Sequence, residues 1–231
     1  TDAQCDHRLI QGLFGDIVQY NTTSQLIEEK TLNDFKINCV VLDYPEADKK
    51  KASKFTWEDE VQFIISNKKR NEMIAKLAVK LNGNTLVLFS RVETHGMLIY
   101  DEIKRLGYEN VHFIYGGTEG DVREEIRKYA DSTNNTIIVA SSQIFSQGIN
   151  IRSLQNIIFT HPSKSRVRVL QSIGRVLRTS ENKSQSVLYD IVDDLRYRGK
   201  QNYSFKHYSE RLVLYSSENF KYKNITIPIK T

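Results

Sequence analysis

The sequence is poor in cysteine and proline and lacks long apolar runs, and each scarcity excludes a class of protein. It has 2 cysteines, Cys5 and Cys39, and 3 prolines in 231 residues. So few cysteines cannot form a disulfide framework and lack metal-ligand spacing, which fits a reducing compartment. No apolar run approaches the roughly 20 residues that cross a bilayer, and the first residues resemble no signal peptide. We therefore expect a cytoplasmic protein with no membrane partner.

A phosphate-binding loop is also missing. The sequence contains no Gly-x-x-x-x-Gly-Lys-Ser/Thr, and its one Gly-Lys pair, Gly199-Lys200, is followed by Gln201. Asp101-Glu102 superficially resembles a magnesium-binding acidic box, but it lies in a predicted amphipathic helix rather than at a strand end. The histidines are too scattered for a metal site. We expect no metal site, and no hydrolysis of a nucleoside triphosphate by this chain alone.

The composition that remains is that of a globular protein. Hydrophobic residues make up 39% and charged residues 26% of the chain, which excludes a disordered or fibrous protein. The formal net charge of +5 weakly favours a polyanionic partner. The chain begins with Thr1 rather than methionine, so we expect it to be a fragment of a longer protein.

Short apolar runs alternate with helical patterns along the chain. Runs that are apolar on both sides indicate strands of a parallel sheet covered by helices. The runs are residues 37–42, 85–89, 111–115, 136–140, 156–160 and 186–192. Ser90 is predicted to cap a helix that stops at Gly107, and Thr118 to cap another that reaches Tyr129. The predicted fold class is α/β, with a parallel sheet flanked by helices.

Residues 171–178, QSIGRVLR, carry the most specific pattern. On a helix, Gln171, Arg175 and Arg178 fall within about 60° of one another, on a different face from the apolar side chains. Arginine suits phosphoryl transfer because its planar, permanently charged fork matches phosphate oxygens. Gly174 beside this face permits the close approach of a ligand. Taken alone, the same spacing also fits an ordinary solvated helical face.

Three other segments precede residues 171–178, and the four together follow the order of the conserved motifs of a known family. Residues 86–90, 114–117, 138–150 and 171–178 resemble motif IV, the motif that follows it, motif V and motif VI of superfamily 2 helicases. Within that superfamily the chain looks most similar to the bacteriophage UvsW type, branch-migrating DNA helicases of recombination and repair. The pair Asp193-Asp194 after the last predicted strand is similar too. The cell would then be an infected host.

The resemblance implies a RecA-like second lobe that works with ATP bound mainly on a first lobe, together with Mg²⁺. Arg175 and Arg178 would reach the nucleotide and Gln171 would help position them. The residues implied beside the nucleotide are Gly148, Asn150 and Gly174, and those implied to face the phosphates of a DNA strand are Ser90, Arg91, Gly117 and Ser141. The family commonly has aspartate in place of Asn150 and threonine in place of Ser141.

Three domains follow from this interpretation. Residues 1–70 would be a connector from the first lobe with a strand and a helix, in which Lys49, Lys50 and Lys51 form a solvated loop. Residues 71–195 would be the RecA-like domain. Residues 196–231 would be a basic, aromatic C-terminal extension. Its rings and cations can hold nucleic acid, or pack a C-terminal helix onto the domain, and we favour the packing role.

Two hypotheses of function remain. The first is the second motor lobe of an ATP-dependent DNA helicase, with branched or duplex DNA, bound independently of sequence, and the first lobe as partners. The second is a stand-alone RecA-like module that binds nucleic acid or protein and has no ATPase activity. The helical face with Gln171, Arg175 and Arg178 favours the first, because a pure binding module has no need of it.

Overall fold

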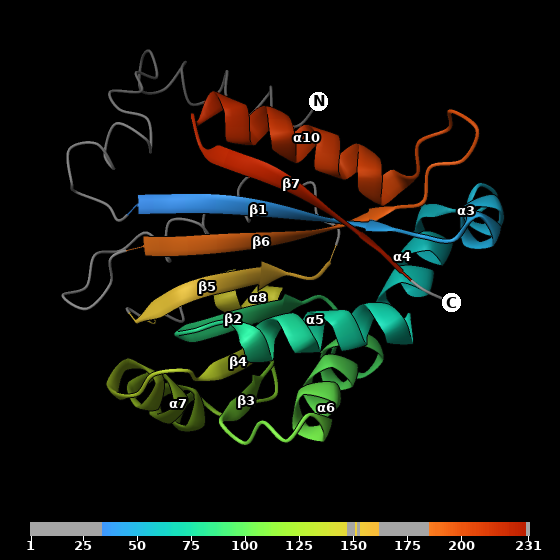
Figure 1. Ribbon diagram of the computed structural model, residues 1–231. Helices are drawn as coiled ribbons and strands as arrows, with labels where there is room; N and C mark the ends of the chain where they lie inside the picture. The colour runs from blue at the N-terminus through green and yellow to red at the C-terminus, as the bar shows by residue number, and fades with distance from the viewer. Residues whose placement is uncertain (1–33, 147–150, 152, 162–184, 230–231) are drawn as a thin grey trace, which may run out of the picture.

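The computed structural model describes residues 34–146, 151, 153–161 and 185–229. These residues form one sheet of seven parallel strands in the order β3-β4-β2-β5-β6-β1-β7 (Figure 1). The strands are β1 (Asp34–Asp43), β2 (Asn84–Phe89), β3 (Val111–Ile114), β4 (Ile137–Ser141), β5 (Leu154–Phe159), β6 (Gln185–Asp194) and β7 (Lys221–Pro228). The predicted α/β fold with a parallel sheet is confirmed.

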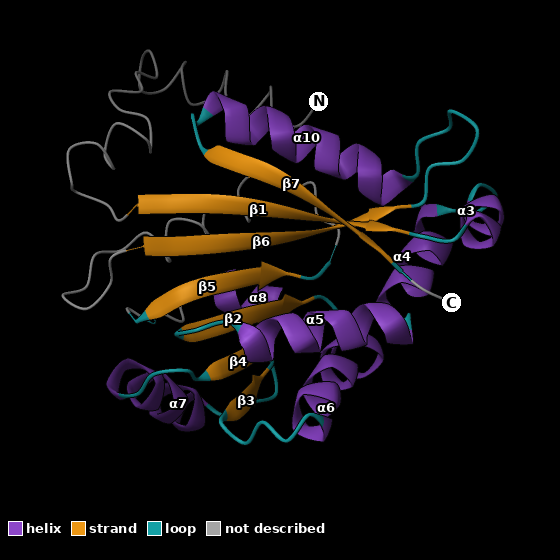
Figure 2. Ribbon diagram, in the orientation of Figure 1, coloured by secondary structure: helices purple, strands orange, loops and turns teal. Residues whose placement is uncertain are grey.

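Helices cover both faces of this sheet (Figure 2). One face packs against α3 (Glu46–Ala52), α4 (Trp57–Ile65), α5 (Lys68–Lys80) and α6 (Met97–Arg105), which follows the π-helical turn η1 (Val92–Gly96). The other face packs against α7 (Gly120–Ser132), α8 (Ser142–Ser146) and α10 (Tyr203–Ser217). The sheet is thus the middle layer of three.

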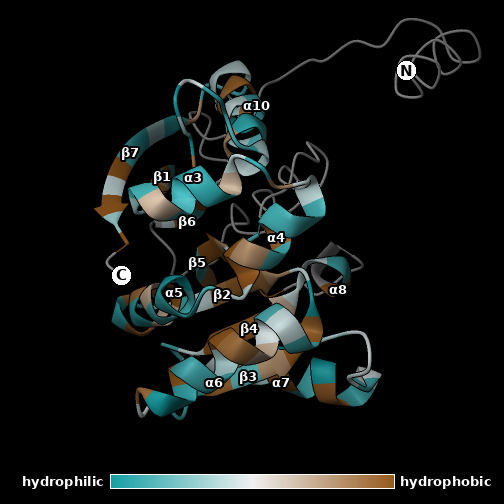
Figure 3. Ribbon diagram, turned by 90° about the vertical axis from the view of Figure 1, so that its right-hand side faces the viewer, coloured by the Kyte–Doolittle hydropathy of each residue, from teal (hydrophilic) through white to brown (hydrophobic). Residues whose placement is uncertain are grey.

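Each face of the sheet has its own apolar core, because successive strand residues point to opposite sides. Val87 and Phe89 of β2 belong to the core beneath α4, α5 and α6. Leu86 and Leu88 belong to the core beneath α7, α8 and α10. Figure 3 shows hydrophobic residues concentrated in the central strands and hydrophilic residues on the outer helices. Burial on both faces explains why apolar residues follow one another in the predicted strands rather than alternate with polar ones.

The helices on the first face begin with local signals. Thr56 caps α4 in a capping box, in which its side chain accepts from the N–H of Asp59 and the Asp59 carboxylate accepts from the N–H of Thr56. Asn67 caps α5 by accepting from the N–H of Arg70 at 3.0 Å. Gly107, with φ of +79°, ends α6 as predicted, since glycine adopts this left-handed conformation without strain.

Two predicted helix starts are wrong. Ser90 does not cap a helix, because η1 begins at Val92 and the N–H of Ser90 instead faces the ring of His95 at 3.5 Å. Thr118 does not cap α7, because its hydroxyl accepts from the N–H of Tyr115 at 3.0 Å and closes a turn. The helix begins at Gly120 without a side-chain cap. Ser90 faces a side chain within η1, and the Thr118 hydroxyl is engaged by the backbone that precedes α7.

The lysine run and the C-terminal segment also differ from expectation. Lys49, Lys50 and Lys51 lie on α3, a short helix, and not in a loop. The C-terminal residues form α10, whose Tyr208, Leu214 and Tyr215 side chains enter the core, so the favoured packing role is confirmed. They then form β7, which the sequence does not predict.

The sheet crosses both predicted domain boundaries. β1, from the expected connector, lies between β6 and β7, and β7 comes from the expected C-terminal extension (Figure 1). The boundaries at 70/71 and 195/196 stay predictions. Strands from all three predicted domains pair in this one sheet. In the ranges that the structure describes, no helix has both the length and the apolar character needed to cross a membrane.

Candidate functional site

The residues predicted to face DNA lie along one edge of the sheet. Ser141 ends β4, Ser90 and Arg91 follow β2, and Gly117 comes shortly after β3. All strands run parallel, so their carboxyl ends meet at the same edge, and Phe89 pairs in register with Ser141. In open α/β sheets this edge is where ligands bind. The structure therefore brings these sequence-predicted residues to one place.

His95 holds the loop that contains Ser90. Its ring is fully buried, its Nδ1 lies 3.5 Å from the N–H of Ser90, and its Nε2 lies 3.2 Å from the Thr160 hydroxyl. That hydroxyl donates to the carbonyl of Leu88 at 2.6 Å. If Ser90 donates to Nδ1, the proton of the neutral ring sits on Nε2 and is donated to Thr160. His95 thus joins the carboxyl ends of β2 and β5.

The His95 ring is neutral at ordinary pH. Burial, helped by the nearby positive charge of Arg70 and by His161 and Arg91, holds the pKa of His95 well below its ordinary value. Burial of an uncharged ring that has partners at both nitrogens carries little cost, whereas a second ring proton would displace the N–H of Ser90. A neutral His95 is therefore part of the geometry of the edge.

A second histidine lies at the end of β5. The Ser142 hydroxyl lies 3.3 Å from Nδ1 and 3.2 Å from Nε2 of His161, and it donates to the carbonyl of Phe89 at 2.9 Å. The neighbouring Ser141 hydroxyl accepts from the N–H of Ile144 at 3.4 Å, at the start of α8. These contacts tie the loops after β2, β4 and β5 together. They also place the Ser141 side chain, which is 8% exposed, against α8.

Arg91 is the one charged residue among the four predicted DNA contacts. Its guanidinium donates to Gln62 Oε1 at 3.0 Å and forms an ion pair with Glu58, both on α4. The side chain is 38% exposed, and ion pairs in such positions contribute little to stability. The arginine can therefore exchange its carboxylate partner for a phosphate at small cost.

Gly117 lies in a tight turn, against the exposed ring of Tyr115. A Cβ at this position would lie 2.6 Å from a ring atom of Tyr115, closer than van der Waals contact allows. The turn is closed from both sides, by the N–H of Thr118 donating to the Tyr115 carbonyl and by the N–H of Tyr115 donating to the Thr118 hydroxyl, each at 3.0 Å. Gly116 and Gly117 are both exposed, so their backbone is accessible to a ligand.

A buried ion pair between Arg70 and Asp193 lies beneath this edge. Asp193 was singled out from the sequence, but Arg70 was not. The Arg70 guanidinium donates from Nε and Nη2 to the Asp193 carboxylate at 2.8 and 3.1 Å and from Nη2 to the Thr160 carbonyl at 2.5 Å. The Tyr44 hydroxyl donates to the same carboxylate at 2.8 Å. Burial lowers the pKa of Arg70, but Asp193 and Tyr44 more than offset this, so its pKa is raised. The group links β1, β5, β6 and α5.

One pattern in the sequence indicates that Arg70 is buried. It lies on the same helical face as Ile74, Ala75 and Ala78, all fully or almost fully buried, whereas its neighbours Lys68 and Lys69 are exposed. A cation on the apolar face of a helix needs a buried partner. Asp193 at the end of a buried strand supplies it.

The predicted catalytic and nucleotide-contacting residues lie outside the described residues. They are Gln171, Arg175, Arg178, Gly148, Asn150 and Gly174. The described chain stops at His161 on the carboxyl edge, before this arginine segment, and resumes at the start of β6. Within the described ranges, no group of three or more metal-ligating side chains comes together.

Comparisons with known proteins agree on a family. A model described as the helicase conserved C-terminal domain matches residues 68–180. The chain is 35% identical to the ATP-dependent DNA helicase uvsW of Enterobacteria phage T4, over 94% of this chain and 45% of that protein. The crystal structure of T4 UvsW matches with a TM-score of 0.73 at 32% identity, covering 86% of this chain and 42% of that one. The chain belongs to the helicase C-terminal domain family.

More distant relatives agree with this assignment of the domain. A putative ATP-dependent helicase of Saccharomyces cerevisiae, IRC3, is 22% identical over 83% of this chain and 28% of its own length. The C-terminal domain of the DEAD-box protein Dbp5 has the same fold, with a TM-score of 0.53 at 11% identity, over 84% of this chain and 90% of that one. The predicted RecA-like second-lobe fold is thus confirmed. This helicase domain spans less than half the length of the curated relatives described here.

Proposed function

We propose that this helicase domain is the second motor lobe of an ATP-dependent DNA helicase that acts in recombination or repair, by branch migration or unwinding. The observation that carries the proposal is the 35% identity to uvsW, named an ATP-dependent DNA helicase, along 94% of this chain. The parallel sheet supports it, because its carboxyl edge gathers Ser90, Arg91, Gly117 and Ser141. Hydroxyl, guanidinium and open backbone N–H groups are the groups that bind phosphates.

The DNA track proposed here binds the backbone of the strand rather than its bases. Arg91 contributes charge, and Ser90 and the turn at Gly117 contribute hydrogen-bond donors. Such contacts carry no sequence information, and they release counterions from the DNA. Binding is therefore expected to be independent of sequence and to weaken as salt is added.

The nucleotide is proposed to lie between this domain and a first lobe. In that arrangement Arg175 and Arg178 neutralise the charge that spreads over the transferring phosphoryl group, and Gln171 positions them and the attacking water. Gly148, Asn150 and Gly174 line the nucleotide. The first lobe supplies the phosphate-binding loop and most of the Mg²⁺ ligands. Hydrolysis then opens and closes the cleft and shifts the grip of both lobes along the DNA.

The test is DNA-stimulated ATPase in a protein that holds both lobes. Arg175→Ala and Arg178→Ala are each expected to lower the turnover number by about 10³ or more, the range measured for arginine fingers. Arg105→Ala serves as the matched control, because Arg105 is an exposed arginine that pairs with Glu102 on α6. Turnover within a few-fold of wild type in both finger variants contradicts the proposed role.

A binding module without ATPase activity would give a different result. The protein would then bind DNA, but the addition of a first lobe and ATP would produce no DNA-stimulated hydrolysis. Arg91→Ala separates the two parts of the proposal. It should raise the DNA concentration needed for half-maximal stimulation and leave the maximal rate near wild type, because Arg91 is placed in the DNA track.

A further inference from the structure

A basic and aromatic surface, separate from the four residues above, lies at the carboxyl edge, beyond the ends of β1 and β6. We define the α4–α10 surface by Trp57 of α4, Lys200 of the preceding loop, and Tyr203, Lys206 and His207 of α10. The Trp57 ring centroid lies 6.1 Å from that of Tyr203 and 4.7 Å from that of His207, edge to face in both cases. Tyr203 is 45% exposed. Rings and cations thus alternate where two helices meet.

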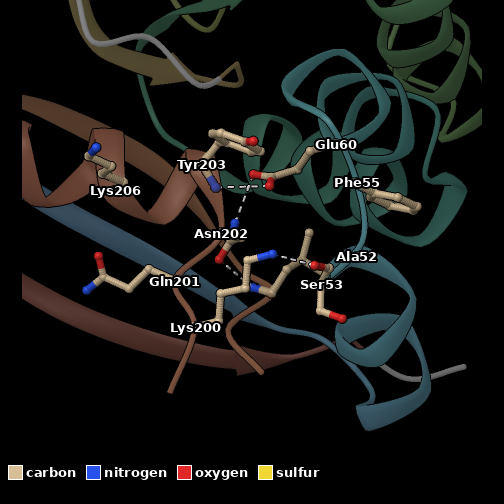
Figure 4. Close-up of a pocket in the computed structure, with 10 residues that line it drawn as sticks. Ala52, Ser53, Phe55, Glu60, Lys200, Gln201, Asn202, Tyr203 and Lys206 are labelled. Carbon is tan, nitrogen blue, oxygen red and sulfur yellow. Dashed lines mark hydrogen bonds between the residues drawn. The ribbon is translucent and has the colours of Figure 1, made fainter. Parts of the chain in front are cut away.

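A hollow of about 180 Å³ lies within this surface (Figure 4). The corner between α3 and α4 forms one wall, and the loop from β6 to α10 forms the other. Lys200 spans the two walls by donating from Nζ to the Ser53 carbonyl at 2.6 Å. Lys206 also lines the hollow, is exposed, and forms no ion pair within the part of the chain that the structure describes.

Two acidic residues at the start of α4, Glu58 and Asp59, are held by partners other than Lys200 and Lys206 in the structure. Glu58 forms its ion pair with Arg91. The Asp59 carboxylate accepts from both the hydroxyl and the N–H of Thr56, which holds the pKa of Asp59 below its usual value. Both carboxylates are thus engaged within the protein.

Glu60 is engaged still more completely. It is 1% exposed, and its carboxylate accepts from the N–H groups of Tyr203 and Ser204 at 2.9 and 2.7 Å. Asn202 Nδ2 donates to it at 2.9 Å. This carboxylate caps the N-terminus of α10 from α4, so it fixes the two helices together and with them the spacing of the rings.

The α4–α10 surface continues the proposed DNA track. Arg91, which follows β2, contacts Glu58 and Gln62 on α4, and Trp57 begins the same helix. The path from Arg91 over α4 to Tyr203 therefore crosses one continuous set of contacts at the carboxyl edge. Alternating rings and cations are the arrangement by which proteins hold single strands, with bases stacked on rings and phosphates beside lysines.

We infer that the α4–α10 surface binds single-stranded DNA as an extension of that track, with bases against Trp57 and Tyr203 and phosphates beside Lys200 and Lys206. The inference rests on the proposed function, since it extends the same DNA interface. It adds a contact outside the helicase motif segments, on a helix that precedes them and a helix that follows them.

Trp57 is the only tryptophan in the chain, so it reports directly on this surface. We expect a thymidine oligonucleotide to quench its fluorescence in a saturable, salt-sensitive manner when added to the whole chain. Tyr203→Ala combined with Lys206→Ala should weaken binding, measured by fluorescence anisotropy of a labelled oligonucleotide, by about tenfold. Losing one phosphate contact should also reduce the slope of log affinity against log salt by about 0.7.

The matched control is Tyr222→Ala combined with Lys221→Ala. These exposed residues begin β7 and therefore lie at the opposite, amino edge of the sheet. The pair should leave affinity within about twofold of wild type. Tyr203→Phe keeps the ring, so together with an unchanged Lys206 it should also bind like wild type. A loss of affinity in Tyr203→Phe equal to that in the Tyr203→Ala and Lys206→Ala double variant overturns stacking as the cause.

The remaining outcomes separate this inference from the proposed function. Binding seen by anisotropy with unchanged Trp57 fluorescence, and with full affinity in the Tyr203 and Lys206 variant, overturns the inference alone. If Arg91→Ala weakens binding in that same protein, the proposed DNA track stands without its extension. Failure of the wild-type chain to bind the oligonucleotide at low salt overturns both.

Discussion

At the scale of single residues, the carboxyl edge depends on charges kept away from water. Arg70 and Asp193 are both almost inaccessible, and Tyr44 completes the group. A buried ion pair costs desolvation for both partners, so its removal as a pair can be nearly neutral. Removal of one partner differs, because the other charge is left buried without compensation.

Arg70→Met should therefore lower the free energy of unfolding by about 3–5 kcal/mol. The substitution keeps the apolar stem but leaves the Asp193 carboxylate with only Tyr44 as a donor. Urea denaturation followed by circular dichroism gives the change. Arg105→Met removes an exposed pair with Glu102 and should alter stability little. A loss below about 1 kcal/mol for Arg70→Met would show that the site relaxes around the lone carboxylate.

His95 predicts how stability depends on pH. The pKa of His95 in the folded chain lies well below the ordinary value of 6.5. Below pH 6.5 the unfolded chain therefore binds a proton at His95 that the folded chain does not bind. The stability linked to His95 is present above pH 6.5 and is lost as the pH falls through the window below it. One unit below the unfolded value, the loss should be about 1.4 kcal/mol.

The measurement compares urea unfolding at pH 7.5 and 5.5 in the wild type and in His95→Gln. The variant is expected to lose less stability between the two pH values, by about 1.4 kcal/mol, because glutamine does not titrate. His112, whose pKa is also lowered by burial, is present in both proteins, so its contribution cancels. Equal losses in the two proteins would mean that the His95 ring is protonated in the folded state.

At the scale of elements, the turn η1 sets how the loop after β2 reaches the carboxyl edge. The N–H of Gly96 donates to the Arg91 carbonyl at 2.9 Å, which is π-helical spacing. A Cβ on Gly96 would lie 2.7 Å from ring atoms of Phe89. That ring is buried and stacked on Phe113 at 5.1 Å, so it has no room to move. The close approach needs glycine.

Gly96→Ala should therefore destabilise the domain by about 1–3 kcal/mol, the usual cost of overpacking a core. It should also displace His95, which precedes it, and Arg91, whose carbonyl accepts from its N–H. Gly120→Ala is the control, because nothing lies within 4 Å of a Cβ there and the residue begins α7. Its melting temperature should be unchanged or slightly raised, since alanine favours a helix. Similar melting temperatures for the two variants would contradict the steric argument.

The sequence predicted six of the seven strands and missed β7 at one edge of the sheet. β2, β4 and β5 each contain an unbroken apolar run, residues 86–89, 137–140 and 157–159, and these runs identify them. β7 is an edge strand with exposed Lys221, Tyr222 and Lys223, and its pattern resembles a solvated tail. Lysine on an edge discourages pairing with other chains. A strand stabilised mainly by its neighbour leaves little signal of its own.

The candidate site was predictable in position but not in its support. Motif resemblance located Ser90, Arg91, Gly117 and Ser141, and parallel strands bring their segments to one edge. The buried partners of this edge come from distant parts of the chain: Arg70 and Asp193 are 123 residues apart. Such pairs follow from tertiary packing, which local pattern does not specify. The Gln171 to Arg178 segment stays a prediction.

At the scale of the whole molecule, β1 and β7 are far apart in the sequence but pair with each other at one side of the sheet. β1 pairs along its length with β6 on one side and β7 on the other. Phe35 of β1 contacts Phe220 edge to face at 5.2 Å. Arg211 and Tyr215 of α10 both donate to the buried Asp190 carboxylate of β6. The described residues beyond 195 therefore form part of the core and of the sheet.

A chain that ends at Leu195 should fail to fold cooperatively. It loses α10 and β7, which exposes the backbone edge of β1 and uncovers the part of the core that Tyr208, Leu214 and Tyr215 fill. Each large apolar side chain that no longer packs there costs roughly 1.5–3 kcal/mol, and the sum is a large share of the roughly 5–15 kcal/mol that stabilises a domain. Light scattering and urea unfolding are the measurements, and a chain ending at Pro228 is the control, because it keeps every strand. A soluble chain ending at Leu195 with the unfolding midpoint of that control would mean that residues 196–231 form a separable extension.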